Sequence, residues 1–420
     1  MKWFITSTRA PAVVLAAALA LPWVVSGCGG AGSAGDAKEL ALWIPPNFED
    51  GSDLKFWDDQ LKAFEEDNGV DVKVTIIPWD TYEERMLAGF SGSQAPDLTY
   101  MYEEMMGDYV SRGQLANFAP YLSDQDKANY SYLPLAQIDG QQIGLPMIVG
   151  AARVMFYNRT ILDQIGAEPP ATWDDFIEVG LKAKEAGHEA FAQAWGDPAK
   201  TGALDGFWPF LWQADGEVLA PDGTAAAFNS PEGVAALQYL HDLRFEHGLL
   251  PEASTALTVA ELNQQFMDGK LLFRLAAESA AASWDEAGID WGFVPSLKGK
   301  QEGTYVVCDS LVLPESAPDK EASTKLANYL LSADVMEAFH AKSPYPPVSA
   351  DEPYSGNPEF RELYEQDSAI LHNLPVAANT APMYDALFDN IQAMFLGQKD
   401  PAQALADAAD AADAALAKNK

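Results

Sequence analysis

Cysteine and histidine are scarce in this chain. Two cysteines and five histidines occur in 420 residues. The histidines form no H-E-x-x-H motif, and His241 and His247 are poorly spaced for one helix face. The segment GFSGS at residues 89–93 lacks the closing glycine of a nucleophile elbow. The sequence therefore predicts no metal site, no catalytic residues and no cofactor.

Basic residues and long apolar runs are also few. The 26 lysines and arginines are outnumbered by 62 acids, which gives a formal net charge of −36. Such a surface repels phosphate backbones, so we exclude nucleic-acid binding. After residue 27, no run reaches the ~18 apolar residues that a membrane helix needs. With 48% hydrophobic residues in a chain of 420, there is enough apolar material for two folded lobes.

The first 27 residues (1–27) have the pattern of a secretory signal. Basic residues precede an apolar run at residues 11–25, and small residues follow. The segment VSGC resembles the lipobox of bacterial lipoproteins, in which the cysteine, here Cys28, is lipidated and anchors the protein to the membrane. Residues 28–37 are then a lipidated tether. The alternative is an ordinary signal peptide with an incidental cysteine. Cys308 is expected to be a buried small hydrophobe without a disulfide partner.

The segment that begins at Lys38 predicts a β-α-β-α-β order. Apolar or alternating runs predict strands at ELALWI, VDVKVTII and PDLTYMY. Helical spacing of apolar residues predicts a helix around Trp57 and another in TYEERMLAGF. This order favours a parallel sheet covered on both faces. A ligand would lie beyond the carboxyl ends of the strands, in the loops after Trp43, Ile77 and Met101.

Cap residues predict further helices along the chain. Thr172, Ser230 and Asp400 each stand directly before a helical pattern. ELNQQFMDGKLLFRLA predicts a helix, a glycine stop and a strand, while TYVVCDSLVLP predicts one buried strand. Helices and strands are therefore mixed throughout the chain, which is the pattern of an α/β protein.

Tryptophan is abundant, with eleven residues in the chain. A flat apolar ring with a polar edge suits the C–H face of a pyranose, and nearby Asp, Glu, Asn or Arg side chains can bind its hydroxyls. A tryptophan can equally fill a core. By position, Trp57, Trp173 and Trp291 are expected in the core. Trp43 and Trp208 are the better candidates for a site.

Several segments occur together in an order known from one family of transport proteins. They include LALWIPPN, APDLTYMYEE, FWPFLWQADGEVLAPDG, FNSPEGVAALQYLHDL and QQFMDGKLLFRLAAES. The most specific block is IDG…GLP…YN…TWDDF, at residues 138–176. Together they resemble the family 1 extracellular solute-binding proteins of ABC importers, the group that contains the maltose-binding protein. The resemblance covers nearly all of residues 38–420.

This resemblance implies an α/β fold of the two-lobe periplasmic-binding-protein type (type II), with hinge-linked lobes and a ligand cleft between them. The chain would cross between lobes near Pro146, Thr304 and Pro347. The expected lobes are 38–146 plus 305–347 and 147–304 plus 348–420. The implied function is capture of a mono- or oligosaccharide at the extracytoplasmic face of the cell membrane. The ligand would be delivered, by a monomer anchored at Cys28, to the transmembrane permease subunits of an ABC transporter.

The resemblance also implies a set of ligand contacts. Three of them, beginning at Tyr102, follow a strand end where the family often contacts sugar hydroxyls. Gly150 stands where the maltose-binding branch has an acid, and Trp284 stands several residues from the position of that branch's second-lobe tryptophan. The expected ligand-binding residues are Trp43, Asn47, Tyr102, Glu103, Glu104, Asp205, Trp208, Glu278, Ser279, Trp284 and Tyr384.

Two other functions are open from the residues alone. The same fold could bind a non-sugar solute such as a polyamine, because Glu103, Glu104 and Glu278 would suit a cation as well as a hydroxyl. A secreted glycosidase would instead use two of these acids for acid/base catalysis. A binding protein forms no product during long incubation with an oligosaccharide, so product analysis separates the last alternative from the others.

Overall fold

The computed structural model describes residues 38–417, except 49, 93, 139, 198–204, 344, 355 and 379. The predicted signal segment 1–27, the lipidation site Cys28 and the tether 28–37 lie outside the described residues. Within the described ranges, no helix is long and apolar enough to cross a membrane.

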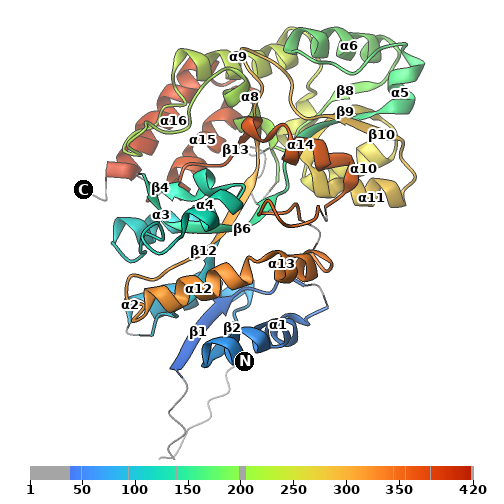
Figure 1. The fold of residues 1–420 in the computed structure, drawn as a ribbon. Coiled ribbons are helices and arrows are strands. Elements are labelled where there is room, and N and C mark those ends of the chain that lie inside the picture. Colours follow the sequence, from blue (N-terminus) through green and yellow to red (C-terminus); the bar gives the residue numbers. More distant parts are fainter. Residues whose placement is uncertain are drawn as a thin grey trace, which may run out of the picture. The chain divides into compact units, whose positions relative to one another are not determined.

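The first sheet contains, in spatial order, β2 (Val70–Ile76), β1 (Lys38–Ile44), β3 (Leu98–Met101), β12 (Val307–Val312) and β6 (Gly144–Gly150) (Figure 1). The strand β1 pairs in parallel with β2 and with β3. The helices α1 (Asp53–Asn68) and α2 (Tyr82–Ser91) connect these three strands. The predicted β-α-β-α-β order is therefore confirmed.

The first sheet is mixed rather than wholly parallel, which corrects the prediction for its other half. The strand β12 runs antiparallel to both β3 and β6. The reason is its connection, because β12 follows directly after the short strand β11 (Thr304–Tyr305) and not after a helical crossover. Val306 separates the two strands, so the predicted single strand in TYVVCDSLVLP is two strands in the structure.

The helix α1 shows why the first connection forms as predicted. Trp57, Leu61 and Phe64 recur at helical spacing, and all three are buried. The helix ends at Gly69, whose φ of 64° lies in the left-handed region that glycine adopts without steric cost. The apolar stripe and the glycine stop together fix the length of α1.

The second sheet contains, in spatial order, β10 (Trp291–Val294), β7 (Arg153–Asn158), β9 (Leu271–Ala277) and β8 (Glu189–Phe191). The strand β7 is antiparallel to both β10 and β9, while β8 is parallel to β9. Two further sheets have two strands each, one of them formed by β11 and β13 (Leu371–His372) and the other by β4 (Gln137–Ile138) and β5 (Gln141–Gln142).

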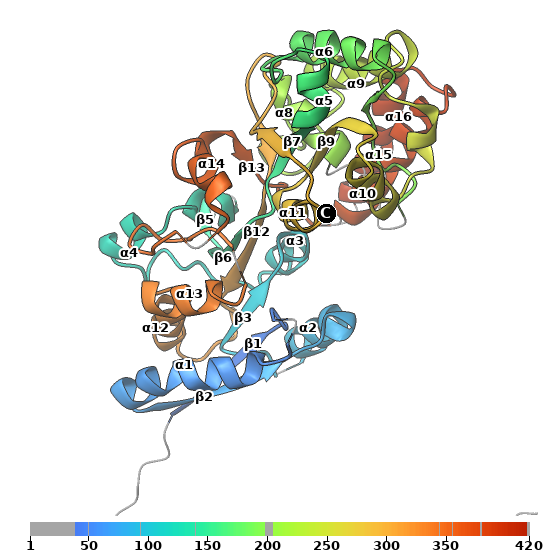
Figure 2. The same cartoon turned by 90° about the vertical axis from the view of Figure 1, so that its right-hand side faces the viewer.

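Other helices pack around these sheets (Figures 1 and 2). They are α3 (Glu103–Ser111), α4 (Asp124–Asn129), α5 (Arg159–Gln164), α6 (Trp173–Glu185), α8 (Trp208–Gln213), α9 (Pro231–Phe245), α10 (Val259–Met267), α11 (Ala281–Glu286), α12 (Lys320–Leu330), α13 (Ala333–His340), α14 (Arg361–Glu365), α15 (Thr380–Phe395) and α16 (Pro401–Leu416). Short 3-10 helices include η1 (Trp79–Thr81) and η4 (Glu278–Ala280).

The three predicted helix caps are confirmed. The Thr172 hydroxyl accepts a hydrogen bond of 3.1 Å from a backbone N–H in the first turn of α6. The Ser230 hydroxyl does the same for α9 at 3.2 Å. The Asp400 carboxylate accepts from the first turn of α16 at 2.8 Å. Each cap satisfies a backbone N–H that the helix itself leaves unpaired.

Short connections join two strands of the first sheet to strands of other sheets. Ala151 and Ala152 join β6 of the first sheet to β7 of the second, and Ala151 has a φ of 52°. Val306 joins β11 to β12, and its N–H donates a 2.8 Å hydrogen bond to the carbonyl of His372. The lobe boundaries themselves stay a prediction. Cys308, in β12, is buried and free, as the sequence predicted.

Candidate functional site

The carboxyl ends of three parallel strands meet at the first part of the site. Asn47 lies in the loop after β1, Trp79 lies in η1 after β2, and Tyr102 follows β3. The indole N–H of Trp79 donates a 3.0 Å hydrogen bond to the carbonyl of Pro46. The ring centroids of Trp79 and Tyr102 are 6.4 Å apart. The prediction that these three loops lie together is confirmed.

Trp79 is the aromatic residue of this part that can meet a ligand. Its exposed fraction is 48%. The sequence selected the loop after Ile77, which contains Trp79, but did not select Trp79 itself as a ligand contact. Its position directly after β2 could have identified it. Ligands lie beyond the carboxyl ends of parallel strands, and this holds for the loop after β2 as for the loops of Asn47 and Tyr102.

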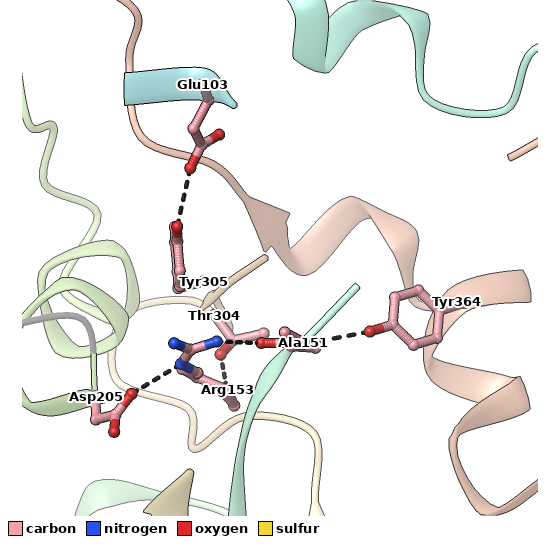
Figure 3. A network of polar contacts seen from close by, with 8 residues as sticks. Glu103, Ala151, Arg153, Asp205, Thr304, Tyr305 and Tyr364 are labelled. Carbon is pink, nitrogen blue, oxygen red and sulfur yellow. Dashed lines mark hydrogen bonds and ion pairs between the residues drawn. The ribbon is translucent and has the colours of Figure 1, made fainter. Parts of the chain in front are cut away.

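Glu103 and Glu104 begin α3 but have different environments. Glu104 is exposed, whereas Glu103 is 1% exposed. One carboxylate oxygen of Glu103 accepts a 2.9 Å hydrogen bond from the hydroxyl of Tyr305 (Figure 3). Burial raises the pKa of Glu103 well above its usual range, and the nearby charges of Glu104 and Asp309 raise it further. Glu104 is therefore the acid of this pair that solvent reaches.

Asp205 is joined to this cluster through Arg153. The Nε of Arg153 lies 2.7 Å from a carboxylate oxygen of Asp205, and both side chains are largely buried (Figure 3). The guanidinium also donates to the carbonyl of Ala151 at 2.5 Å. Its carbon lies 5.1 Å from the centroid of the Tyr305 ring. The charge of Asp205 is thus neutralised by Arg153, which reduces its capacity to accept further hydrogen bonds from a ligand.

Glu278 and Ser279 line a cavity of about 400 Å³. Ser279 is exposed, and Glu278 is partly buried. The hydroxyl of Tyr364 donates a 2.7 Å hydrogen bond to Glu278 and accepts one of 3.3 Å from the N–H of Ala152. Burial raises the pKa of Glu278 to about 7, although the bond from Tyr364 opposes the shift. The cavity lining also includes Ala151, Ala282, Ser343, Tyr345, Asn357 and Phe360.

Asp309 is a further acid near this site, and it is not among the ligand contacts expected from the sequence. It lies in β12, and the hydroxyl of Tyr100 donates a hydrogen bond to it. Burial raises the pKa of Asp309 to about 7. The sequence contains a signal for it, a single acid inside the apolar run TYVVCDSLVLP. Burying a charged side chain in a strand costs free energy, so such a residue often has a specific role.

Three of the expected aromatic contacts are buried in this structure, and their contact with a ligand stays a prediction. Trp43 is 6% exposed, Trp208 is 1% exposed and Trp284 is 0% exposed. The guanidinium of Arg85 covers the ring of Trp43 at 4.9 Å. The other two rings pack within the core against neighbouring aromatic side chains. In this structure none of the three presents a free ring face for a sugar to stack on.

Tyr384 lies beside one of these core tryptophans. It is partly buried in α15, and its ring centroid is 5.9 Å from that of Trp208. Its contact with a ligand stays a prediction, as do those of Asn47, Tyr102, Glu103, Glu104, Asp205, Glu278 and Ser279.

Among the residues that the structure describes, no group of three or more His, Cys, Asp or Glu side chains could hold a metal ion.

The sequence of this chain matches one family of known proteins. Residues 59–362 match the family described as bacterial extracellular solute-binding protein. The match covers more than half of the chain, so the chain belongs to this family. Its members are binding proteins that act outside the cytoplasm.

Individual relatives are distant but similar over most of their length. A binding protein of Brucella abortus (strain 2308) is 26% identical over 379 residues, which cover 86% of this chain and 90% of that protein. The maltooligosaccharide ABC transporter solute-binding lipoprotein of Streptococcus pneumoniae (strain R6) is 23% identical over 407 residues, with 89% of this chain and 88% of that protein covered.

A solved structure confirms the fold class. The crystal structure of the cyclic alpha-maltosyl-1,6-maltose binding protein from Arthrobacter globiformis matches with a TM-score of 0.74 and 20% identity. The match covers 90% of this chain and 99% of that chain. The two-lobe α/β solute-binding fold that the sequence predicted is therefore confirmed.

Proposed function

We propose that this protein captures a mono- or oligosaccharide and delivers it to the transmembrane subunits of an ABC importer. The observation that carries the proposal is Trp79, which is 48% exposed where three strand ends meet, with the ring of Tyr102 at 6.4 Å. An exposed indole beside a phenol offers stacking surface for a pyranose. The carboxylates of Glu104 and Glu278 offer acceptors for its hydroxyls.

The names of the relatives support a carbohydrate over other solutes. The protein of Streptococcus pneumoniae is named for maltooligosaccharides, and the protein of Arthrobacter globiformis for a cyclic maltosyl-maltose. Both match this chain over about nine tenths of its length. In this chain burial raises the pKa of three acids near the proposed site, Glu103, Glu278 and Asp309.

Lipidation of Cys28 is part of the proposal. An anchor at Cys28 would hold the binding protein near its permease, and tethering raises the effective concentration of one partner at the other. The relative from Streptococcus pneumoniae is itself named a lipoprotein, which supports this arrangement. A monomer suffices for delivery. The proposed lobes, 38–146 plus 305–347 and 147–304 plus 348–420, would close around the ligand by a hinge movement.

A ligand screen tests the proposed function. The chain without residues 1–28 is melted with maltodextrins, arabino-oligosaccharides and simple hexoses, and with polyamines and amino acids as controls. A ligand at 100 times its dissociation constant adds about 2.7 kcal/mol to the free energy of unfolding, which raises the melting temperature measurably. A shift with one group of sugars supports the proposal. A shift with polyamines alone contradicts the sugar class but leaves solute capture in place.

Product analysis tests the absence of catalysis. The protein is incubated for days with the oligosaccharide that gives the largest thermal shift, and the mixture is separated by chromatography. We expect the oligosaccharide to be recovered intact. Shorter products that disappear in a Glu278→Gln variant would instead identify a glycosidase, because a carboxyl group with a pKa of about 7 is suited to general acid catalysis.

A further inference from the structure

A second cavity, of about 310 Å³, lies between α2 and α3. Figure 2 shows α2 beside β1 and α3 beside β3 of the first sheet. The helices pack through Phe90 and Tyr109, whose ring centroids are 4.8 Å apart. We call this cavity the α2–α3 groove; its lining includes Glu83, Leu87, Tyr102, Glu104, Asp108 and Arg112.

The α2–α3 groove is continuous with the candidate site. Tyr102 and Glu104 belong to the groove lining and also to the cluster at the strand ends. Trp79 also belongs to that cluster, and its ring centroid lies 6.4 Å from that of Tyr102. The hydroxyl of Tyr102 donates a hydrogen bond to Glu83 on α2, so the ring is held in place between the site and the groove.

The lining of the groove has the mixed character that a sugar requires. Leu87 is 49% exposed and supplies apolar surface. Glu83 and Glu104 supply carboxylate acceptors, and Arg112 supplies guanidinium donors 3.9 Å from Asp108. Hydroxyls of a neutral sugar can use acceptors and donors together. An apolar peptide would offer no hydrogen-bond donor to the carboxylate of Glu104, and burying that carboxylate would be costly.

We propose that the α2–α3 groove holds the outer sugar units of an oligosaccharide whose inner units lie against Trp79 and Tyr102. The inference rests on the carbohydrate-binding function proposed above and names its ligand class more narrowly. The ligand is then an oligosaccharide, and a mono- or disaccharide occupies only the part of the site at the strand ends. The affinity of the protein for a ligand therefore depends on chain length.

Calorimetry with a length series tests this proposal. The chain without residues 1–28 is titrated with maltose to maltohexaose and with the matching arabino-oligosaccharides. We expect the dissociation constant to fall by about tenfold from the disaccharide to the tetrasaccharide. The double variant Leu87→Ala/Arg112→Ala removes the apolar and cationic parts of the groove. It should weaken tetrasaccharide binding by about tenfold and change disaccharide binding by less than twofold.

The control is Leu54→Ala, because Leu54 lies on α1, is 48% exposed and lies outside the groove lining. It should bind every length as the unchanged protein does. Two results would contradict the proposal that outer sugar units bind in the α2–α3 groove: equal affinity for all sugar lengths, or normal tetrasaccharide binding by the double variant. Both would leave the proposed carbohydrate binding in place. Failure to bind a sugar of any length would instead overturn the proposed function, and the groove with it. Hydrogen exchange gives a second readout, since only the longer sugars should protect α2 and α3.

Discussion

Tyr305 donates a 2.9 Å hydrogen bond to Glu103, and this bond connects β11 with the first turn of α3 (Figure 3). Tyr305 directly precedes Val306, where the chain enters the first sheet, while Glu103 directly follows the end of β3 and Tyr102. Glu103 is 1% exposed, so its carboxyl group depends on protein donors. The bond therefore ties the first turn of α3 to the connection between the sheets.

Tyr305→Phe should destabilise the protein. The substitution leaves a carboxylate oxygen of Glu103 buried without its hydroxyl donor, which costs about 1–3 kcal/mol. Urea unfolding of the variant measures the loss. The double variant Tyr305→Phe/Glu103→Gln measures the coupling free energy between the two residues. The effects of two substitutions on the free energy of unfolding do not add when the residues are in contact. A Tyr305→Phe variant as stable as the unchanged protein would show that the hydrogen bond contributes nothing to folding.

Glu278 should make stability fall as pH rises toward neutrality. Its pKa is about 7 in the folded protein and 4.5 ordinarily, so between these values the folded state holds a proton that the unfolded state has lost. Unfolding therefore becomes easier as pH rises from about 4.5 to 7, and the penalty is complete above 7. Since a tenfold change in proton affinity is about 1.4 kcal/mol, a pKa raised from 4.5 to about 7 predicts that Glu278→Gln gains on the order of 3 kcal/mol at pH 8.

Melting temperatures of this variant between pH 5 and pH 8 check the expectation. The gain should be absent near pH 4.5 and should grow with pH, because glutamine does not titrate. The matched control is Glu286→Gln in α11, since Glu286 is exposed. A gain that is the same at every pH, or that the control shares, would assign the effect to something other than the carboxyl group of Glu278.

Gly107 and Gly180 form a matched pair of helix glycines. A Cβ on Gly107, in α3, would lie 2.2 Å from the carbonyl oxygen of Ala377, which is backbone and cannot move aside alone. A Cβ on Gly180, in α6, would lie 2.9 Å from a methyl group of Leu249, at the flexible end of a side chain. Alanine favours a helix over glycine by about 1 kcal/mol. We therefore expect Gly107→Ala to lose about 1–3 kcal/mol and Gly180→Ala to be nearly neutral, as measured by urea unfolding.

The local sequence was sufficient to predict most of the fold around α1. The spacing of Trp57, Leu61 and Phe64 identifies its buried face, and Gly69 identifies its end. The caps at Thr172 and Ser230 were equally local signals. The direction of β12 could not be predicted from its own sequence. It depends on the pairing of β12 with β3 and β6, which are distant in the sequence.

The site was predicted less well, because exposure is decided by packing between elements. The strand-end rule placed the loops of Asn47, Trp79 and Tyr102 together. It did not tell which tryptophan in those loops stays exposed. Trp43 is covered because Gly89 allows α2 to approach closely, and a Cβ there would lie 2.6 Å from its ring. Neither residue shows this contact in its own sequence segment.

Trp43 and Trp79 should separate stability from binding. Trp43 is 6% exposed and Trp79 is 48% exposed, so Trp43→Ala creates a core cavity whereas Trp79→Ala removes surface that a sugar would stack on. We expect Trp43→Ala to lose about 3–5 kcal/mol of unfolding free energy. Trp79→Ala should melt like the unchanged protein and bind its sugar about fivefold to tenfold more weakly, since stacking on an aromatic ring is worth about 1–1.4 kcal/mol.

Calorimetry and thermal melting of both variants measure the two effects independently. Leu54→Ala is the control for Trp79→Ala, because it removes an apolar side chain of the same exposed fraction, 48%, from α1. Binding that survives in Trp79→Ala and fails in a folded Trp43→Phe would reverse the assignment. The loop after β1, rather than the loop after β2, would then supply the stacking ring, and Trp43 would have to become exposed when the ligand binds.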